Sequence, residues 1–335
     1  MLLFGGESSE HTVSISSARN VFAALDDTKY DVVLGYIDQI GKWWLLDNLS
    51  DQIDNIGLPQ LLPVLGTGNF KVLPTNELIT PAVILPILHG ANGEDGTVQG
   101  LAKLMHIPIV GCKVSASAIA MDKVITKELL EHNNIKTVPY EVHILGEARP
   151  SFNHLSNRLG SSLFVKPARS GSSIGTSKVK NDNELSIALS EAHKYDSKVL
   201  IEKAISAREL EVGMLGSGLK ARASVVGEIC PDREFYNFES KYDVNSQTKV
   251  IIPADISAEL SEEIRNIATH AYRVLGCEGL ARIDFFLSDD NILYLNEVNT
   301  IPGFTNISMY PKLWRQEGLT YSGLIDALIS NALEK

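Results

Sequence analysis

Residues 281–286 read Ala-Arg-Ile-Asp-Phe-Phe and residues 294–299 read Tyr-Leu-Asn-Glu-Val-Asn. Both stretches alternate apolar and polar side chains, which is the periodicity of a β-strand. Residues 288–291, Ser-Asp-Asp-Asn, lie between them and favour a turn. The sequence therefore predicts a β-hairpin, closed at this turn, in which Asp284 lies opposite Leu295.

One face of this hairpin would carry a distinctive polar set. Residues two apart on a strand share a face, and Arg282 is predicted opposite Glu297, so Asp284 and Asn299 join them. Two carboxylates and an amide beside an arginine suit Mg²⁺ with phosphate, because Mg²⁺ takes a few carboxylates plus phosphate oxygens. A solvated sheet face with a salt bridge is the alternative. The asparagine adds no pairing charge, which favours the metal site.

Composition bounds the class of protein. A chain of 335 residues suggests about two or three domains, and a hydrophobic content of 44% is enough for a real core. The net charge of −11 argues against a nucleic-acid partner, which would need a basic surface. The three cysteines are far apart, which favours buried thiols in a reducing compartment. No apolar run reaches membrane length and the start resembles no signal peptide, so a cytoplasmic location without membrane contact is predicted.

The first third of the chain alternates strand and helix patterns. Such a rhythm predicts a parallel sheet covered by helices, with ligands at the carboxyl ends of its strands. The loops 5–10 and 89–96 follow predicted strands, are rich in glycine and polar residues, and are therefore candidates for a site. The predicted strands are 2–4, 31–37, 83–88 and 107–110, and the predicted helices are 13–25 and 97–105.

The remainder predicts an α+β arrangement. A single helix is expected over 115–134, and the polar segment 231–248 is expected to form a long loop or lid. The other predicted helices are 183–194, 260–274 and 321–333, and the other predicted strands are 162–166, 177–180, 199–202 and 210–215.

A glycine- and serine-rich loop follows Lys166. Its small residues at 170–175 would let backbone N–H groups approach phosphate oxygens, although neither GxxxxGK[ST] nor GxGxxG occurs in the chain. The same loop matches GxSxG, which would make Ser173 the nucleophile of a serine hydrolase. That motif needs a helix directly after the serine, whereas residues 176–180 alternate like a strand. A hairpin covering phosphates is the preferred interpretation, and the hydrolase is a minor alternative.

Several other residues are weak candidates when taken singly. Residues 200–204 form a strand that leads into a polar link, which suits recognition of adenine, and Glu209 beyond it could take a ribose hydroxyl. The Pro302-Gly303 turn directly follows the metal face and could direct the Gly303 N–H towards a developing oxyanion. His89 ends a predicted strand, where contact with a substrate is plausible, and Lys123 follows a helical turn.

Seven ordered segments together resemble the D-alanine–D-alanine ligase family of the ATP-grasp superfamily, over nearly the whole chain. They are Leu3-Phe4-Gly5-Gly6 with Ser9-Glu10-His11, His89-Gly90…Gly93-Glu94-Asp95-Gly96, Met121-Asp122-Lys123, Lys166-Pro167…Gly171-Ser172-Ser173…Gly175, Glu239-Ser240-Lys241-Tyr242, Arg282-Ile283-Asp284, and Asn296-Glu297-Val298-Asn299-Thr300…Pro302-Gly303.

The resemblance implies an ATP-grasp fold in three parts. These are an N-terminal parallel-sheet α/β domain at 1–114, a small central α+β domain at 115–200, and a larger C-terminal α+β domain at 201–335.

The resemblance also implies how ATP and metal are held. Lys123 and Lys166 would bind the phosphates, with the Ser172-Ser173 loop closing over them. The metal would be two Mg²⁺ ions, or Mn²⁺, held by Asp284, Glu297 and Asn299. Further residues implied for the nucleotide are Glu202 and Lys203 at adenine, Glu209 at ribose, Lys241 at the γ-phosphate, and Asn296.

For the amino-acid substrates, the implied roles centre on Glu10. This residue would orient the ammonium of the first D-alanine, in a hydrogen-bonded set with Ser172 and Tyr242. Arg282 and the Gly303 N–H would stabilise the tetrahedral intermediate. Two further residues are implied as substrate contacts, namely His89 near the first D-alanine and Ser308 at the carboxylate of the second.

The implied reaction is ATP-dependent joining of two D-alanines through an acyl phosphate, for peptidoglycan precursors, by a homodimer. Ligases of the resistance type, which join D-alanine to D-serine or D-lactate, are the alternative. Asn306-Ile307 replaces the Ser-His of many members, which bears on the second-substrate pocket, while Tyr242 argues against lactate. A catalytically silent nucleotide-binding module is a third possibility, disfavoured by the intact metal and phosphate residues.

Overall fold

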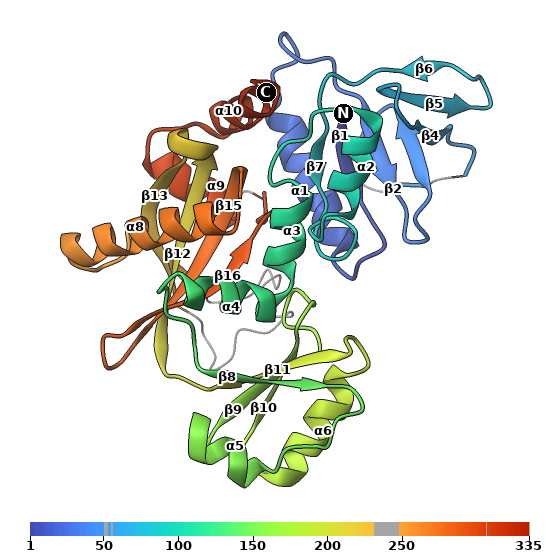
Figure 1. The fold of residues 1–335 in the computed structure, drawn as a ribbon. Helices are drawn as coiled ribbons and strands as arrows, with labels where there is room; N and C mark the ends of the chain where they lie inside the picture. The colour runs from blue at the N-terminus through green and yellow to red at the C-terminus, as the bar shows by residue number, and fades with distance from the viewer. Residues whose placement is uncertain (50–52, 55, 231–247, 306, 335) are drawn as a thin grey trace.

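Three β-sheets and their helices make up the molecule (Figure 1). The computed structural model describes residues 1–49, 53–54, 56–230, 248–305 and 307–334. A seven-stranded sheet lies at the upper right of Figure 1, a five-stranded sheet at the left and a four-stranded sheet at the bottom. The mixture of α/β and α+β parts agrees with the predicted ATP-grasp architecture.

The N-terminal sheet has the order β6-β5-β4-β3-β2-β1-β7. Only β2, β1 and β7 run parallel, and β3 to β6 extend the sheet as an antiparallel meander. The parallel prediction therefore holds for three strands. The predicted strand at 107–110 is wrong, because this segment makes only an isolated bridge between Ile84 and Ile109. The strands are β1 Leu2–Gly5, β2 Leu34–Ile37, β3 Trp43–Leu46, β4 Gln60–Val64, β5 Asn69–Leu73, β6 Leu78–Ile79 and β7 Leu85–Ile87.

Helices from both ends of the sequence pack beside this sheet. Helices α1 (His11–Ala24) and α2 (Thr97–Met105) flank it, and α10 (Tyr321–Leu333) lies next to α1 (Figure 1). Phe4 of β1 belongs to the same buried cluster as Trp314 and Leu328 from the last helices. The N-terminal sheet and the C-terminal helices therefore share one hydrophobic core, which fixes the N-terminal loops relative to the rest of the molecule.

The single helix predicted over 115–134 is two helices, α3 (Val114–Met121) and α4 (Lys123–His132). The break lies at Asp122, whose backbone is extended and whose carboxylate accepts hydrogen bonds from the N–H groups of Val124 and Ile125 at 3.1 and 3.2 Å. Aspartate favours this capping position because it satisfies N–H groups that a helix start leaves unpaired. The cap places Lys123 at the very start of α4.

The four-stranded sheet is antiparallel, in the order β10-β9-β11-β8, and two helices cover it. Its buried apolar residues form a separate small core. The elements are β8 Tyr140–Ile144, α5 Phe152–Leu159, β9 Leu163–Pro167, β10 Ser177–Val179, α6 Asp182–Ala192 and β11 Lys198–Lys203.

The five-stranded antiparallel sheet has the order β14-β13-β12-β15-β16, and α3, α4 and α8 contribute to its core. Residues 231–247, most of the predicted lid, lie outside the described residues. The elements are β12 Ala207–Gly216, the 3₁₀ turn η1 Gly218–Lys220, β13 Arg222–Cys230, β14 Lys249–Ile251, α8 Ala258–Val274, β15 Gly279–Ser288, β16 Leu293–Asn299 and α9 Met309–Gln316.

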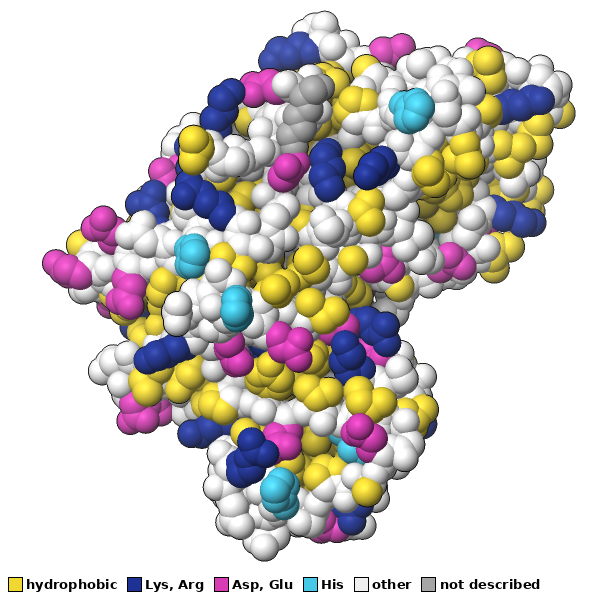
Figure 2. Space-filling view, in the orientation of Figure 1, with side chains coloured by type: hydrophobic (Ala, Val, Ile, Leu, Met, Phe, Trp, Pro, Cys, Tyr) yellow, Lys and Arg dark blue, Asp and Glu magenta, His cyan; other side chains and the backbone are white. Residues whose placement is uncertain are grey.

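The surface is mixed in charge. On the face drawn in Figure 2, basic and acidic side chains are interspersed. Among the described helices, none combines the length and apolar character needed to cross a lipid bilayer.

Candidate functional site

Strands β15 and β16 form the predicted hairpin, but in a different register. Arg282 pairs with Asn299 and Asp284 with Glu297, so the predicted pairs Arg282–Glu297 and Asp284–Leu295 are wrong by two residues. The register shifts between Asp284 and Phe285, because Phe285 pairs with Leu295 and Asn296 is left as an extra residue on β16. A shift of two keeps every side chain on its face. The predicted polar face is therefore present.

The β-bulge at Asn296 explains how β16 places apolar side chains in the core and polar side chains on the opposite face of the sheet. Leu295 and Val298 are both buried, although residues three apart point to opposite sides of a regular strand. The extra residue of a bulge corrects this mismatch. The core side chains can therefore point inwards while Glu297 and Asn299 lie on the polar face.

Arg282 is the centre of that face. Its Nε and Nη2 donate to the two oxygens of Asp284 at 2.7 Å each, and Asn299 Nδ2 donates to Asp284 Oδ2 at 2.9 Å. The Arg282 Nε also lies 2.9 Å from Oε2 of Glu211. Burial opposes the charge on the guanidinium, but Asp284 and Glu211 outweigh it and raise the pKa of Arg282 above its ordinary value.

Glu211 was missed by the sequence analysis. It lies on β12, directly opposite Asp284 of β15, and its side chain is 7% exposed. The alternation of Leu210, Glu211 and Val212 does indicate that Glu211 faces away from the core. Its closeness to Arg282 depends on the pairing of β12 with β15, which are some 70 residues apart and which no local pattern connects.

The residues of this face fit a divalent metal ion. Asp284, Glu297 and Asn299 offer two carboxylates and an amide on neighbouring strands, which is the hard oxygen chemistry of Mg²⁺. Within the described part of the chain, no group of three or more His, Cys, Asp or Glu side chains could hold a metal ion. The candidate ligand set therefore consists of two carboxylates with the Asn299 amide.

The glycine- and serine-rich loop reaches from the central sheet to the N-terminal loops. Ser172 Oγ donates to Oε1 of Glu10, a buried residue, at 2.5 Å. An added Cβ would lie 3.2 Å from Oε2 of Glu10 at Gly171 and 3.1 Å at Gly90, so both loops approach this carboxylate closely. Two loops distant in sequence therefore approach Glu10, and Ser172 of the implied set is its hydrogen-bond donor.

The structure contradicts the context that a serine hydrolase would need at Ser173. The loop leaves β9 and enters β10, and α6 begins only at Asp182. A nucleophile elbow places its serine between a strand and an immediately following helix. The GxSxG match is therefore part of a strand–loop–strand hairpin, as preferred from the sequence.

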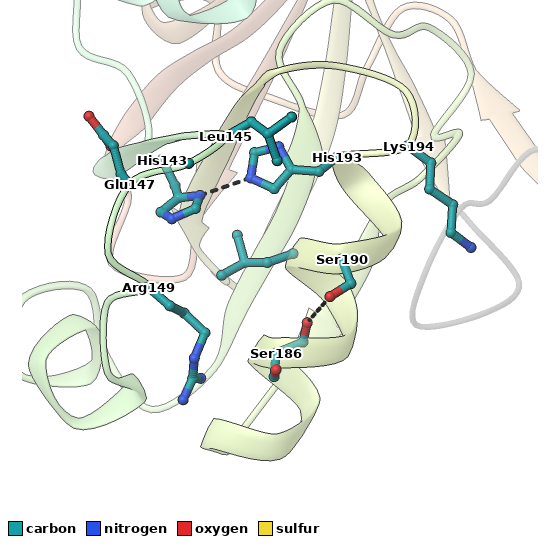
Figure 3. Close-up of a pocket in the computed structure, with 10 residues that line it drawn as sticks. His143, Leu145, Glu147, Arg149, Ser186, Ser190, His193 and Lys194 are labelled. Carbon is teal, nitrogen blue, oxygen red and sulfur yellow. Dashed lines mark hydrogen bonds between the residues drawn. The ribbon is translucent and has the colours of Figure 1, made fainter.

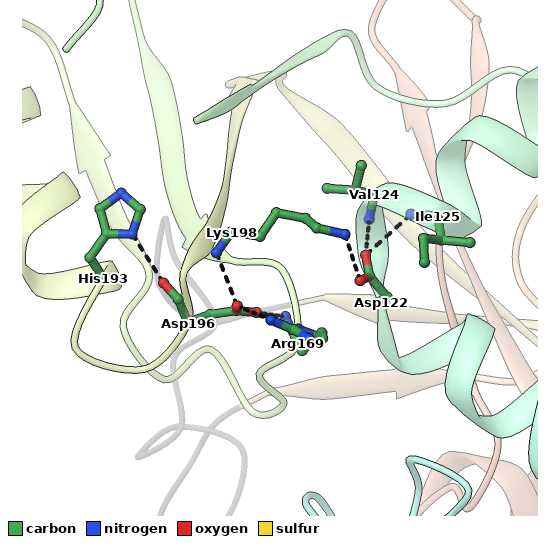
Figure 4. A network of polar contacts seen from close by, with 7 residues as sticks. All are labelled: Asp122, Val124, Ile125, Arg169, His193, Asp196 and Lys198. Atoms are coloured by element: carbon green, nitrogen blue, oxygen red, sulfur yellow. Dashed lines mark hydrogen bonds and ion pairs between the residues drawn. The ribbon is translucent and has the colours of Figure 1, made fainter. Parts of the chain in front are cut away.

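A polar network holds the base of this loop (Figure 4). The Asp196 carboxylate accepts from the backbone N–H and Nε of Arg169 at 2.9 and 3.0 Å, and from the Lys198 N–H at 3.0 Å. Lys198 Nζ in turn donates to Asp122 at 2.8 Å. The network links strand β11 to the loop and to the start of α4, and the last two carry candidate phosphate ligands.

The two lysines implied for phosphate binding lie on either side of this loop. Lys123 Nζ donates to the Ser170 carbonyl at 2.6 Å, and its backbone N–H donates to the Ala168 carbonyl at 3.0 Å. Lys166 Nζ lies 2.5 Å from Oε2 of Glu202. Lys166 is thus paired with the carboxylate implied for adenine.

Two further nucleotide candidates lie near the junction of β11 and β12, whereas Asn296 lies on β16. Lys203 ends β11 and is exposed, and Glu209 lies on β12 opposite Phe286 of β15. Lys241 and Tyr242 lie outside the described residues.

His89 is buried, and both of its ring nitrogens have partners within the protein. It is 5% exposed, its Nδ1 lies 3.2 Å from the Ile301 carbonyl, and its Nε2 lies 3.3 Å from Ser17 Oγ. Because a carbonyl only accepts, Nδ1 carries the proton and Nε2 accepts from the serine. Burial, only partly offset by Glu10, lowers the pKa of His89. The two ring nitrogens therefore join the start of the 89–96 loop to helix α1 and to the segment before Gly303.

Gly303 and Ser308 form one compact turn. The Ser308 hydroxyl accepts from the Thr305 N–H at 3.0 Å and lies 2.8 Å from Thr305 Oγ1. A Cβ on Gly303 would come within 2.9 Å of Ser308 Oγ. The two residues implied for the intermediate and the second carboxylate are therefore neighbours.

Glu94 is a second acidic residue for which the sequence predicted no separate role. It accepts from the Gly90 N–H at 2.9 Å. Burial and the nearby carboxylates of Glu10 and Glu297 raise its pKa to about 8, against the smaller opposing effects of the Gly90 hydrogen bond and Arg282. In the metal-free protein, these effects favour the protonated form of Glu94 at neutral pH.

This protonation should make the stability of the metal-free protein pH-dependent. Between its ordinary pKa of 4.5 and about 8, folded Glu94 holds a proton that the unfolded chain has lost. The free energy of unfolding therefore falls as the pH rises through this window. Glu94→Gln should remove this contribution and be more stable than the parent by about 1–2 kcal/mol at pH 9 but not at pH 4.5. Urea unfolding in EDTA measures it, and a difference that does not change with pH would contradict it.

A separate hollow of about 450 Å³ lies in the central unit (Figure 3). Across it His143 Nδ1 lies 2.8 Å from His193 Nε2, and His193 Nδ1 lies 3.0 Å from the Asp196 carbonyl. The carbonyl fixes the proton on His193 Nδ1, so His143 is the donor to His193. None of the predicted site residues lines this hollow, whose walls are His143, Leu145, Gly146, Glu147, Arg149, Ser186, Leu189, Ser190, His193 and Lys194.

Comparison with known proteins shows the family of this chain. Residues 1–112 match the family model described as D-ala D-ala ligase N-terminus, and residues 129–330 match D-ala D-ala ligase C-terminus. A D-alanine–D-alanine ligase of Clostridium acetobutylicum is 45% identical over all of this chain and 97% of its own length. The D-alanine–D-alanine ligase A of Escherichia coli K12 is 42% identical over all of this chain and 95% of its own length.

Solved structures give the same result. The D-alanine–D-alanine ligase of Coxiella burnetii superposes with a TM-score of 0.89 at 34% identity, over 99% of this chain and 93% of its own. The VanG D-Ala:D-Ser ligase of Enterococcus faecalis has the same TM-score at 32% identity, over 99% of this chain and 98% of its own. The family models together cover most of the sequence, and the relatives match it from end to end. The chain therefore belongs to the D-alanine–D-alanine ligase family.

Proposed function

We propose that this protein is an ATP-dependent ligase that joins two D-alanines into D-alanyl-D-alanine for peptidoglycan precursors. The observation that supports this most is the polar face of β15 and β16, where Arg282, Asp284, Glu297 and Asn299 meet. This face combines metal-type oxygens with a buried cation, which suits transfer of a phosphoryl group to a carboxylate. The names of the relatives supply the substrate class.

The nucleotide is assigned to the space beside the glycine- and serine-rich loop. Lys123 and Lys166 bind its phosphates, and the loop at Ser172 and Ser173 covers them with backbone N–H groups. The purine and ribose are assigned to the junction of β11 and β12, with Glu202, Lys203 and Glu209, and Asn296 lies with the nucleotide. Lys241 is proposed at the γ-phosphate.

Mg²⁺, held by Asp284, Glu297 and Asn299 as two ions, would supply the positive charge that offsets charge on the transferring phosphoryl group.

In the first step, a carboxylate oxygen of one D-alanine attacks the γ-phosphorus of ATP and ADP leaves. Glu10, held by Ser172 and with Tyr242 completing the set, accepts hydrogen bonds from the ammonium of this D-alanine and so orients it. His89 is proposed to act near this substrate through the loops it joins. The product of the step is an acyl phosphate.

In the second step, the neutral amine of the second D-alanine attacks the acyl carbon, and the C–N bond forms as a tetrahedral intermediate appears. The intermediate then collapses: the C–O bond to phosphate breaks, the nitrogen loses a proton, and inorganic phosphate leaves. Arg282 and the Gly303 N–H bind the oxyanion of the tetrahedral intermediate. Ser308 is proposed to bind the carboxylate of the second D-alanine. Exclusion of water around the acyl phosphate would prevent its hydrolysis.

The proposed function is tested by phosphate release. The purified protein with Mg²⁺ should release phosphate only when both ATP and D-alanine are present, and mass spectrometry should identify D-alanyl-D-alanine. ATP turnover that is indifferent to D-alanine would contradict the proposal. A fluorophosphonate probe should leave Ser173 unlabelled, whereas labelling would favour the hydrolase.

The acceptor is tested in the same assay. The VanG D-Ala:D-Ser ligase matches this chain as well as the Coxiella enzyme does, so D-serine and D-lactate should be offered beside D-alanine. D-alanyl-D-alanine is expected as the main product from an equimolar mixture. A cytoplasmic homodimer with Mn²⁺ as an alternative ion completes the proposal, and light scattering tests the dimer.

A further inference from the structure

Lys127 is a completely buried lysine that no role described above uses. It lies on α4, one turn after Lys123, and its side chain is 1% exposed. A lysine on a helix is usually a solvated charge, and a buried lysine is costly unless it is paired. The surroundings of Lys127 should therefore show what retains it there.

Lys127 shares its counter-ion with a lysine assigned to ATP. Its Nζ lies 2.7 Å from Oε1 of Glu202, whereas Lys166 Nζ lies 2.5 Å from Oε2 of the same carboxylate. Glu202 is also buried, with a side chain that is 6% exposed. Lys127 also donates to the Val138 carbonyl at 3.3 Å and lies 5.4 Å from the centre of the Tyr140 ring. One buried carboxylate thus holds two ammonium groups.

The two lysines differ in access. Lys166 is 15% exposed and is the second-last residue of β9, before the glycine- and serine-rich loop, whereas the Lys127 side chain is only 1% exposed. Only Lys166 can turn towards a phosphate without unpacking the core. When it does, Glu202 still has Lys127, and a neutral buried pair remains instead of an isolated buried carboxylate.

We propose that Lys127 is a positioning residue for ATP binding. Its ammonium group remains paired with the Glu202 carboxylate, so that Lys166 is free to bind phosphate. Without Lys127, Lys166 is the one cation among the described residues that is ion-paired with Glu202, and the carboxylate competes with ATP for it. This inference rests on the proposed function, because that proposal assigns Lys166 to the phosphates.

The test is a double-mutant cycle on ATP binding, measured by calorimetry on the full-length protein with Mg²⁺ and without D-alanine. Lys127→Met keeps the length of the side chain and removes its charge, and should weaken ATP binding roughly ten- to hundredfold. Lys127→Met should cause no further loss in a Glu202→Gln background, because the competing charge is then absent. Lys113→Met serves as the matched control, since Lys113 is half-buried and its Nζ donates to the Ile109 carbonyl, and it should bind ATP as the parent does.

Each outcome decides. Equal ATP affinity of the parent and Lys127→Met, or an equal loss in both backgrounds, would overturn the proposal, because a purely structural role acts regardless of Glu202. If Lys127→Met fails to fold, the ATP affinity of Glu202→Gln is compared with that of the double variant Lys127→Met/Glu202→Gln. The double variant removes both buried charges together. Weaker ATP binding by the double variant would overturn the proposal. A parent protein that binds no ATP would instead refute the proposed function.

Discussion

Replacing Asp284 by asparagine is expected to lower kcat for phosphate release on the order of 10³-fold while leaving the protein folded. Asp284 pairs with Glu297 across the hairpin and receives two hydrogen bonds from Arg282. The amide keeps the size of the side chain but removes the charge on which both the metal and the guanidinium depend. Raising the Mg²⁺ concentration should recover part of the activity, because metal affinity is one component of the loss.

The matched control for this variant lies on the same hairpin. Asp290→Asn makes the same chemical change in the exposed turn between β15 and β16, and should retain the activity of the parent. Steady-state phosphate release with saturating ATP and D-alanine measures both. Unchanged activity of Asp284→Asn would refute the assignment of this face to metal, whereas a parent protein without activity would favour the silent nucleotide-binding module.

Replacing Arg282 by methionine is expected to damage both catalysis and stability. The substitution leaves Asp284 and Glu211 without their shared cation, and breaking a buried ion pair on one side costs about 3–5 kcal/mol. Loss of a donor to the oxyanion should lower kcat by about 10²–10³-fold in the fraction that remains folded. Urea unfolding measures the first effect and phosphate release the second.

A second substitution separates the two effects of Arg282. Arg282→Met combined with Glu211→Gln removes one uncompensated carboxylate, so stability should partly return while activity does not. Arg273→Met, in the exposed last turn of α8, is the control for the loss of an arginine and should change neither quantity. Return of activity in the double variant would show that Arg282 acts only on the fold.

Local periodicity was sufficient to predict the hairpin and the membership of its polar face. The register was wrong because nothing in Tyr294-Leu295-Asn296 marks the extra residue of the bulge, whose position depends on how β16 packs on the core. The predicted helix over 115–134 failed for a related reason. Asp122 is a tolerable residue within a helix and a strong cap, and only its contacts with Val124, Ile125 and Lys198 decide between the two.

The residues that sequence analysis missed are those whose partners are distant. Glu211 meets Arg282 through the pairing of β12 with β15, and Lys127 meets Glu202 through the packing of α4 against β11. The antiparallel meander β3–β6 was also missed, since its short strands carry weak alternation. In each instance the deciding contact is tertiary, and a one-dimensional pattern carries no information on it.

The bulge at Asn296 also bears on which changes of chain length the enzyme can tolerate. Deleting Asn296 would make β16 a regular strand, and either Leu295 or the pair Glu297 and Asn299 would then have to change sides. A deletion in the exposed turn at 289–291, by contrast, shortens only a surface connection. Related ligases should therefore differ in the length of that turn. The number of residues between Leu295 and Val298 should be the same in all of them, because an insertion or deletion there would disrupt the core or the polar face.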